Sequence, residues 1–391
     1  MARGGYLEKN DEARALFENL KILNITHHNE DIGAIRVENL VGFAKVPLGL
    51  AGPLKVLGPQ TDGEFYAPLA TCEATLIASC ARGCRLLNLS KGARFDVLSE
   101  GMNRAPVFLL DNPQQAVAFF HFWPSLQDDF KRWTESTSSH LRLKHTKASV
   151  IGSNVHVFCA FDCGDASGQN MVTKACQHAC TQVMAASIKR GHEVKQFLID
   201  GQMASDKKPS WTHVMEPRGV EVMAWATISD QDCRKIMRCS TAQLYKTHRM
   251  IKDGGIRNGQ FGDNANTANI TAAIFIATGQ DAASVAEDSW SHLTTEYDEA
   301  TKDMHVSIYF PSLTIGIVGG GTRYPTQKEG LRILGCDGKP GSKHRLAGLI
   351  ACFSLALELS TTAAITEGTF AKSHMVLARG ESRKIMGPSK L

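Results

Sequence analysis

The stretch Asn264–Ser284, NANTANITAAIFIATGQDAAS, predicts the helix around which the rest of the chain is organised. From Ile270 to Ala277 nearly every residue is apolar, so this helix should be buried on all sides. Gly279 weakens the helix near its end, and Asp281 follows. Burial and the helix macrodipole both favour the neutral form of a carboxyl group there. Asp281 is therefore a candidate for proton transfer or for pairing with a buried cation. The alternative is a solvated acid just past the helix.

Length and composition exclude several classes of protein. The 391 residues allow two or three domains at ~100–200 residues each. With 43 basic and 39 acidic side chains, the net charge of +4 does not indicate a nucleic-acid partner. The 11 cysteines include no CxxC pair, which is typical of reduced thiols in an intracellular protein. We therefore expect neither a disulfide framework nor a metal site.

The two ends of the sequence bear on localisation. Residues 1–20 are charged throughout and lack the apolar segment of a signal peptide. The most apolar run, Leu346–Leu357, is shorter than the ~20 residues of a membrane span, so it predicts a second core helix. The last residues, Ser389-Lys390-Leu391, form the tripeptide that a peroxisomal import receptor reads. We expect a peroxisomal protein without a membrane span, and a cytoplasmic one if this signal is not used.

The first part of the chain leads into a core helix. Residues 37–57 alternate apolar residues with glycine and proline, which is typical of a turn-rich region. A strongly apolar helix is predicted from about Thr75 to Leu87, with Glu73 at its head. An acid in the first turn gains from the macrodipole, so a simple terminal charge is the alternative to a chemical role for Glu73. Residues 101–106 are expected to close this segment.

The pattern changes in the middle of the chain. Short strand candidates at 106–111 and 154–162 flank a polar, aromatic helix at about 114–134, which predicts an inserted α+β domain. The predicted divisions are therefore 1–105, 106–197 and 198–391, with the tail in the last segment.

Two loops rich in small residues could approach a ligand. The loop at 165–170 opens the predicted helix Met171–Lys189, so its free N–H groups could hold a phosphate. It lacks the GxGxxG pattern of a Rossmann fold. Residues 315–322, IGIVGGGT, contain three glycines that allow close approach of the backbone to a ligand. A flexible turn is the alternative for this second loop.

Several motifs together resemble the catalytic portion of the hydroxymethylglutaryl-CoA reductases. The matches follow the family's order over about residues 35–380, and DKKP and GGGT point to its eukaryotic-type branch, without that branch's membrane anchor. The matching motifs are ENLVGFAKVPLGLAGPL (38–54), LATCEATLIASCARGCR (69–85), GMNRAPV (101–107), DASGQNM (165–171), SDKKPS (205–210), NANTANITAAIFIATGQDAA (264–283), IGIVGGGT (315–322) and FAKSHMVLAR (370–379).

The resemblance implies an α+β fold and a reductase chemistry. It implies a large domain around a long buried helix, an inserted ferredoxin-like small domain with part of the NADPH site, and homodimers or dimers of dimers that share the active site. Glu73 would donate a proton to the carbonyl, Lys207 would stabilise the oxyanion, and Asp281 would tie the two together. His374 would protonate the departing CoA thiolate. Hydride delivery to a thioester builds negative charge on oxygen, which an ammonium and a proton donor can stabilise.

The resemblance also assigns binding residues. For NADPH it implies Asp165, Ser167, Gly168, Asn170, Gly319, Gly320, Thr322 and Arg379. For the CoA thioester it implies Arg104, Asp200, Asp206, Lys208, Arg249, Asn266 and Asn269.

One departure from the family pattern bears on the substrate. Asp200 stands where the family has a serine that helps hold the terminal carboxylate of hydroxymethylglutarate. Two like charges at ~4 Å repel by about 4 kcal/mol at an effective dielectric of 20. Pairing of Asp200 with Arg104 or Arg249 would leave the usual substrate possible.

We therefore expect NADPH-dependent reduction of a CoA thioester to the alcohol through a bound aldehyde, as in the conversion of hydroxymethylglutaryl-CoA to mevalonate. The alternatives are an enzyme for another acyl-CoA whose distal end is not a carboxylate, and a retired relative that only binds CoA esters. Retention of all four chemical residues favours an enzyme.

Overall fold

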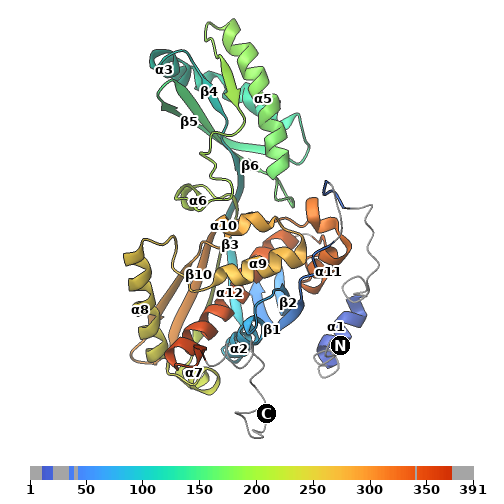
Figure 1. Cartoon of the computed structure of the whole chain (residues 1–391), viewed down its shortest axis with the longest axis vertical. Coiled ribbons are helices and arrows are strands. Elements are labelled where there is room, and N and C mark those ends of the chain that lie inside the picture. The colour runs from blue at the N-terminus through green and yellow to red at the C-terminus, as the bar shows by residue number, and fades with distance from the viewer. Residues whose placement is uncertain (1–10, 21–34, 39–42, 340, 372–391) are drawn as a thin grey trace.

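The structure is a computed structural model that describes residues 11–20, 35–38, 43–339 and 341–371 (Figure 1). Its strands form a sheet in the order β7-β4-β6-β3-β8-β10-β9, with β1, β2 and β5 off this path. The mixture of helices and strands confirms the predicted α+β class. The strands are β1 (Leu48–Gly58), β2 (Thr61–Ala70), β3 (Ala93–Arg104), β4 (Val107–Leu109), β5 (Arg142–Ile151), β6 (Asn154–Asp162), β7 (Gln196–Leu198), β8 (Gly219–Ile228), β9 (His292–Tyr297) and β10 (Met304–Leu313).

The long strand β3 belongs to both halves of the molecule. Its residues from Arg94 to Gly101 pair with β8, and those from Met102 to Arg104 pair with β6, antiparallel in both cases. In Figure 1 this strand runs from the lower body of the molecule into the upper one. Most of residues 101–106, which were predicted to close the first segment, form the end of this strand, which two sets of strands share.

The buried residues form two large clusters. One combines residues from β1 to α12 (Ser342–Thr366), and the other lies wholly between Met102 and Val194. The second cluster packs α3 (Pro113–Phe122), α4 (Gln127–Glu135) and α5 (Gln169–Lys189) against β4 to β6. The single helix predicted at 114–134 is wrong: a 3-10 turn that contains Pro124 separates α3 from α4, and proline cannot donate to a continuous helix. The domain boundaries at 105 and 197 stay a prediction.

The other helices belong to the lower body in Figure 1 or to its connections with the upper one. They are α2 (Leu76–Leu89), α6 (Thr212–Met215), α7 (Asp230–Met237), α8 (Thr241–Asn258), α9 (Thr267–Thr278), α10 (Val285–Asp288) and α11 (Pro325–Ile333), with α1 (Asp11–Leu20) at the start and the 3-10 turns η3 (Ala282–Ser284) and η4 (Gly320–Arg323). The 3-10 turn between α3 and α4 is η2 (Trp123–Leu126).

Two apolar helices cross the centre of the lower body. Eight of the 12 residues of α9 are buried, which confirms a core helix. The prediction of burial on all sides is wrong for one narrow stripe, where Ala268 and Ile276 are exposed. Helix α12 is long and apolar enough to cross a membrane, but 94% of its most apolar window is buried inside the protein. It is longer than the predicted run of 346–357, because the helix continues through Glu358, which is fully buried.

Glu358 joins these two helices. Its carboxylate accepts hydrogen bonds from the backbone N–H groups of Ala265, at 2.8 Å, and Asn266, at 2.7 Å. Asn266 is the N-cap residue of α9, and its side chain does not cap the helix. The N–H groups of Ala265 and Asn266 find their acceptor in an acid from another helix. The side-chain amide of Asn266 instead donates to Thr361 of α12 at 2.9 Å. Burial raises the pKa of Glu358 to about 7, although the two N–H groups oppose this shift.

Replacing Glu358 with alanine should destabilise the protein by about 2 to 6 kcal/mol, because two buried N–H groups lose their acceptor at ~1–3 kcal/mol each. Urea unfolding followed by circular dichroism measures the change. The matched control is Glu367→Ala, an exposed acid at the other end of α12, which should change stability by no more than about 0.5 kcal/mol. Equal effects of the two substitutions would contradict the role of Glu358.

Candidate active site

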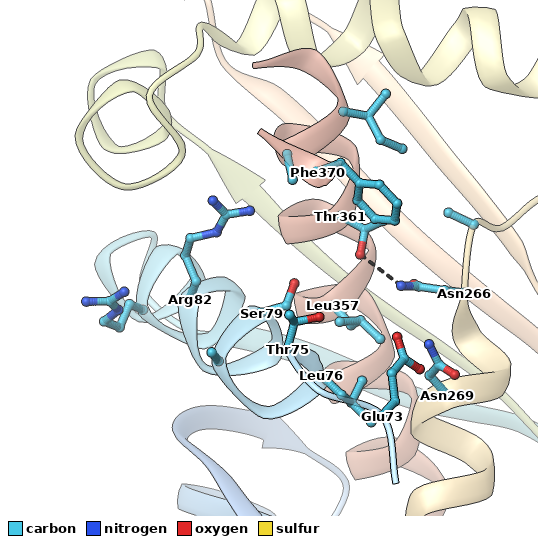
Figure 2. A pocket seen from close by; sticks show the side chains of 15 residues that line it. Glu73, Thr75, Leu76, Ser79, Arg82, Asn266, Asn269, Leu357, Thr361 and Phe370 are labelled. Carbon is cyan, nitrogen blue, oxygen red and sulfur yellow. Dashed lines mark hydrogen bonds between the residues drawn. The ribbon is translucent and has the colours of Figure 1, made fainter. Parts of the chain in front are cut away.

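A cavity of about 470 Å³ lies between α2, the start of α9 and the second half of α12 (Figure 2). Glu73 and Asn269 point into it, and Asn266 lies above them. Its lining residues are Glu73, Thr75, Leu76, Ala78, Ser79, Arg82, Arg85, Ala265, Asn266, Asn269, Leu357, Thr361, Ala364, Ile365 and Phe370. The structure thus brings together three residues that the sequence assigned to one site.

Glu73 lies outside the first turn of α2, which begins at Leu76. Its backbone N–H donates to Thr71 Oγ1 at 3.0 Å. Glu73 is exposed and lines the cavity. The alternative to a chemical role, a simple charge at the helix N-terminus, would have required Glu73 to lie within the first turn of α2. The position of Glu73 at the cavity favours a chemical role instead.

Three lining residues of α2 were not predicted from the sequence. Ser79, Arg82 and Arg85 recur at three-residue intervals, so they share one face of the helix, and this spacing could have revealed them. The guanidinium group of Arg82 is held by Ser360 of α12, whose hydroxyl accepts from Nε at 2.9 Å. The cavity therefore carries fixed positive charge on one side.

A second set of predicted residues surrounds Lys207. Its Nζ lies 3.2 Å from Asp281 Oδ2, and the two side chains are 44% and 40% exposed. The predicted burial of Asp281 is therefore wrong. Helix α9 ends at Thr278, with Gly279 in the left-handed conformation, and Asp281 accepts from the N–H of Ala283 at 3.1 Å as the N-cap of η3. The predicted pairing with a cation holds, but the cation is exposed.

The loop before Lys207 is tied to β3. Arg104, almost buried at the end of β3, lies 3.0 Å from Asp200 and 3.4 Å from Asp206. The ammonium group of Lys208 donates to the carbonyl of Asp206 at 3.1 Å. The structure thus has the predicted alternative, in which Asp200 pairs with Arg104. Beneath the loop lie two buried residues that sequence reasoning missed, Arg218 and Glu287.

The two loops of small residues lie side by side. Ala166 forms a bridge with Val318, and the carbonyl of Asp165 accepts from the N–H of Ile317 at 2.9 Å. A Cβ on Gly316 would lie 2.4 Å from the nitrogen of Ser167, so only glycine permits this approach. The amide of Gln280 bonds both the N–H and the carbonyl of Gly316 at 2.9 and 3.0 Å.

The remaining predicted residues of this group fit the same place. Gly168 is the N-cap of α5 with φ 85°, and Asn170 lies in the first turn of that helix. Gly319 and Gly320 have φ values of 83° and 51° and face open space. The hydroxyl of Thr322 donates to the carbonyl of Gly319 at 2.6 Å.

Arg249 is not part of the cavity that Glu73 lines. It lies in the middle of α8 and lines a separate cavity of about 230 Å³ with Tyr245, Lys252 and Thr295 among others. Its guanidinium carbon is 5.9 Å from the ring of Tyr245. His374 and Arg379, and the final tripeptide from Ser389 to Leu391, lie outside the described residues.

The two main groups of predicted residues lie at opposite ends of α9. Asn266 and Asn269 mark its first turn, beside Glu73, whereas Asp281 follows its last turn and pairs with Lys207. A helix of 12 residues is about 18 Å long at 1.5 Å per residue. Within the described chain, the lining of the cavity with Glu73 includes neither Lys207 nor Asp281.

Comparison with known proteins points to one family. The family model for hydroxymethylglutaryl-coenzyme A reductase matches residues 2–379. A 3-hydroxy-3-methylglutaryl-coenzyme A reductase of Aeropyrum pernix is 38% identical over 350 residues, which cover 88% of this chain and 82% of that protein. The 3-hydroxy-3-methylglutaryl coenzyme A reductase 1 of Cannabis sativa is 36% identical over 345 residues, which cover 86% of this chain and 58% of that protein.

A solved structure has the same fold. The class II 3-hydroxy-3-methylglutaryl-CoA reductase from Streptococcus pneumoniae, bound to NADPH in open conformations, aligns with a TM-score of 0.71. The alignment covers 93% of this chain and 100% of that one at 15% sequence identity. At this identity the likeness concerns the fold alone.

Proposed function

The chain belongs to the hydroxymethylglutaryl-coenzyme A reductase family, and we propose that it uses NADPH to reduce hydroxymethylglutaryl-CoA to mevalonate. The observation that carries this proposal, beyond family membership, is the ion pair of Lys207 with Asp281 at 3.2 Å. This pair supports the proposal because an ammonium group held by an acid can stabilise a developing oxyanion. A CoA-binding relative without activity would have no use for this arrangement.

The described residues fit NADPH. Helix α5 begins at Gln169, and its N-cap Gly168 makes no side-chain cap, so the first N–H groups of the helix are available to a phosphate. Gly319 and Gly320 leave open space beside this helix start, which lets a flat ring approach the backbone. When bound, NADPH supplies the hydride. We assign Asp165, Ser167, Gly168, Asn170, Gly319, Gly320 and Thr322 to this site, and Arg379 on the resemblance alone.

The chain's own residues then supply charge and protons. Lys207 stabilises the oxygen of the carbonyl as it becomes negative, and Asp281 fixes the position of the ammonium group. Glu73 donates the proton that turns this oxygen into a hydroxyl. His374 protonates the departing thiolate, a role for which an ordinary imidazole pKa is suited and which rests on the resemblance. Arg82 and Arg85 provide guanidinium groups for the phosphates of CoA.

We also propose a homodimer in which each active site combines two copies. Glu73 and Lys207 lie at opposite ends of α9, too far apart for one carbonyl to reach both within one chain. The surface near Lys207 exposes large apolar side chains, with Trp211 at 67%, Met215 at 80% and Phe261 at 42%. Such a surface is typical of a protein interface.

The small domain of this proposal comprises residues 106–197. Its support is the separate hydrophobic cluster between Met102 and Val194, around which α3 to α5 pack. We propose a ferredoxin-like domain inserted into the large one, with strand β3 as the shared element. The loop at 165–170 then carries the cofactor contacts from the small domain to the large domain.

Glu73→Gln and Lys207→Ala should each lower turnover of hydroxymethylglutaryl-CoA by at least ~10³-fold, the scale of a lost proton donor or oxyanion stabiliser. NADPH oxidation at 340 nm measures the loss. If the two inactive variants are unfolded, mixed and refolded together, about a quarter of wild-type activity should return, since half of random dimers carry one intact site of two. Full loss in the mixture, with mixed dimers present, would contradict the shared site.

The residues assigned to the acyl group of the substrate, Asp200 and Arg104, leave a second candidate function. This function is the reduction of a CoA thioester whose distal end is neutral. The observation that favours it is the ion pair of Asp200 with Arg104 at 3.0 Å, which neutralises a cation that a substrate carboxylate would need. Arg104 already shares its charge with Asp206 at 3.4 Å. A carboxylate in the substrate would therefore have to displace Asp200 or accept its repulsion.

Asp200→Ser should lower the KM for hydroxymethylglutaryl-CoA by about 10-fold or more, because it frees Arg104 and removes a charge that repels the substrate carboxylate. A 10-fold change in binding corresponds to ~1.4 kcal/mol. Steady-state kinetics of the variant and the wild type measure the effect, with Asp200→Asn as a control that keeps the shape and removes the charge. Efficient turnover by the wild type that Asp200→Ser does not improve would exclude the second candidate.

Localisation in peroxisomes is a further part of the proposal, and it rests only on Ser389-Lys390-Leu391. Deleting Leu391 should leave activity intact and move the protein to the cytosol, because the tripeptide is a label that a receptor reads. Fluorescence imaging of tagged protein, with the tag at the N-terminus, measures the change. An unchanged peroxisomal pattern would show that another signal directs import.

A further inference from the structure

The loop that carries Lys207 has an unusual backbone. Three of its residues that are not glycine have positive φ values: Gln202 at 66°, Ser205 at 52° and Lys207 at 61°. Side chains with a Cβ disfavour this left-handed conformation, so it persists only where the surroundings hold it. The side chains beneath the loop therefore decide whether Lys207 keeps its place.

A buried ion pair lies directly beneath this loop. The side chains of Arg218 and Glu287 are both 0% exposed, and their closest atoms are 2.6 Å apart. Arg218 also lies 2.8 Å from Asp206, the neighbour of Lys207. Glu287 thus reaches the loop through Arg218, which bridges it to Asp206. His213, 3.6 Å from Glu287, contacts the carbonyl of Ala204 at 3.3 Å.

The same short segment therefore supports the loop at two points. Asp281 at the start of η3 pairs with the ammonium group of Lys207, and Glu287 in α10 holds Arg218, which pairs with Asp206. The two acids are six positions apart on consecutive turns, so a shift of this segment would move both contacts together. Because positioning errors of ~1 Å can cost about 100-fold in rate, such a double contact matters for catalysis.

We propose that Glu287, together with Arg218, is a positioning residue that holds the loop of Ala204–Lys208 so that the Lys207 amine meets the substrate oxygen. This inference rests on the proposed reductase function. Glu287 touches neither substrate nor cofactor in this scheme, and it acts on the loop through Arg218 and Asp206.

The charges around Glu287 make this support dependent on pH. Burial raises its pKa to about 7, while Arg218 opposes the shift. Burial lowers the pKa of His213, which favours its neutral form, and raises the pKa of Asp288 well above its ordinary value. The charged and titratable groups that face Glu287 are Arg218 from the start of β8, Asp206 and Lys207 from the loop, His213 from α6, Asp281 from η3 and Asp288 from α10 itself.

The sign of the effect follows from the carboxylate. Above pH 7 Glu287 is charged, so it holds Arg218 strongly, and below pH 7 it takes up a proton and weakens this contact. The kcat of the wild type should therefore fall as the pH drops through about 7.

The test compares Glu287→Gln with the matched control Asp288→Asn. Asp288 is the next residue, equally buried, and accepts from the N–H of Thr314 at 3.0 Å and from its hydroxyl, away from the loop. Glu287→Gln should lower kcat about 100-fold and leave KM within about 3-fold of the wild-type value. It should also remove the acid limb of the pH profile, which is the fall of kcat below about pH 7. Asp288→Asn should keep kcat and the limb. Equal losses of kcat in both variants, or an acid limb that survives in Glu287→Gln, would overturn the proposal.

A second measurement needs no turnover. Competitive acetylation of Lys207 with acetic anhydride, read by mass spectrometry across pH 6 to 9, reports the environment of its amine in the free protein. In the wild type the labelling should show an inflection near pH 7 besides the amine's own titration, and Glu287→Gln should label several-fold faster at pH 8. A wild-type profile without that inflection would overturn the proposal even if Glu287→Gln does not fold.

The labelling also separates this inference from the proposed function. If the wild type does not oxidise NADPH with hydroxymethylglutaryl-CoA, the proposed function fails, while the Lys207 labelling still decides whether Glu287 positions the loop. If the wild type is active and the labelling of Lys207 is identical in both variants, only the role of Glu287 fails.

Discussion

The hydrogen bonds of Glu358 to the start of α9 are the constraint on which the rest of the site depends. They fix one helix against the other inside a core where few polar partners exist. Helix α9 in turn carries Asn266 and Asn269 to the cavity at one end and leads to Asp281 at the other. Just after the C-terminal end of α9, Gly279 packs closely on Gly321. A Cβ on Gly279 would lie 2.3 Å from the backbone of Gly321. One buried helix thus sets the positions of both groups of functional residues and of the glycine loop.

The sequence predicted those features that local pattern determines. Residues 270–277 were expected to form a buried helix because no face is polar, and most of α9 is buried, although Ile276 is exposed. The helices at 75–87 and 171–189 and the strand at 154–162 were found within a few residues for the same reason. The residues of the site came from ordered motifs rather than from periodicity. Their grouping around one cavity and one ion pair follows from the fold, which no single motif describes.

What the sequence could not predict depends on contacts between distant segments. Arg218 and Glu287 are 69 positions apart, and neither lies in a pattern that marks it as buried. Glu358 appeared to interrupt an apolar run, because an isolated acid is read as exposed until its partners at Ala265 and Asn266 are known. Asp281 was placed at the end of α9, whereas Gly279 turns the chain and makes it the cap of the next turn. In each case a tertiary partner decides the environment of a charge.

The balance of charge around the Lys207 loop follows from these partners. Two buried arginines serve three acids: Arg104 faces Asp200 and Asp206, and Arg218 faces Asp206 and Glu287. Glu287 is the fully buried acid of the three, so desolvation disfavours negative charge most strongly there. Its pKa therefore rises to about 7, although Arg218 opposes the shift. The acids nearer the surface keep some contact with water. The same surplus opposes an anionic substrate tail, so the number of acids around Arg104 and Arg218 links the choice of substrate to the protonation of the loop's support.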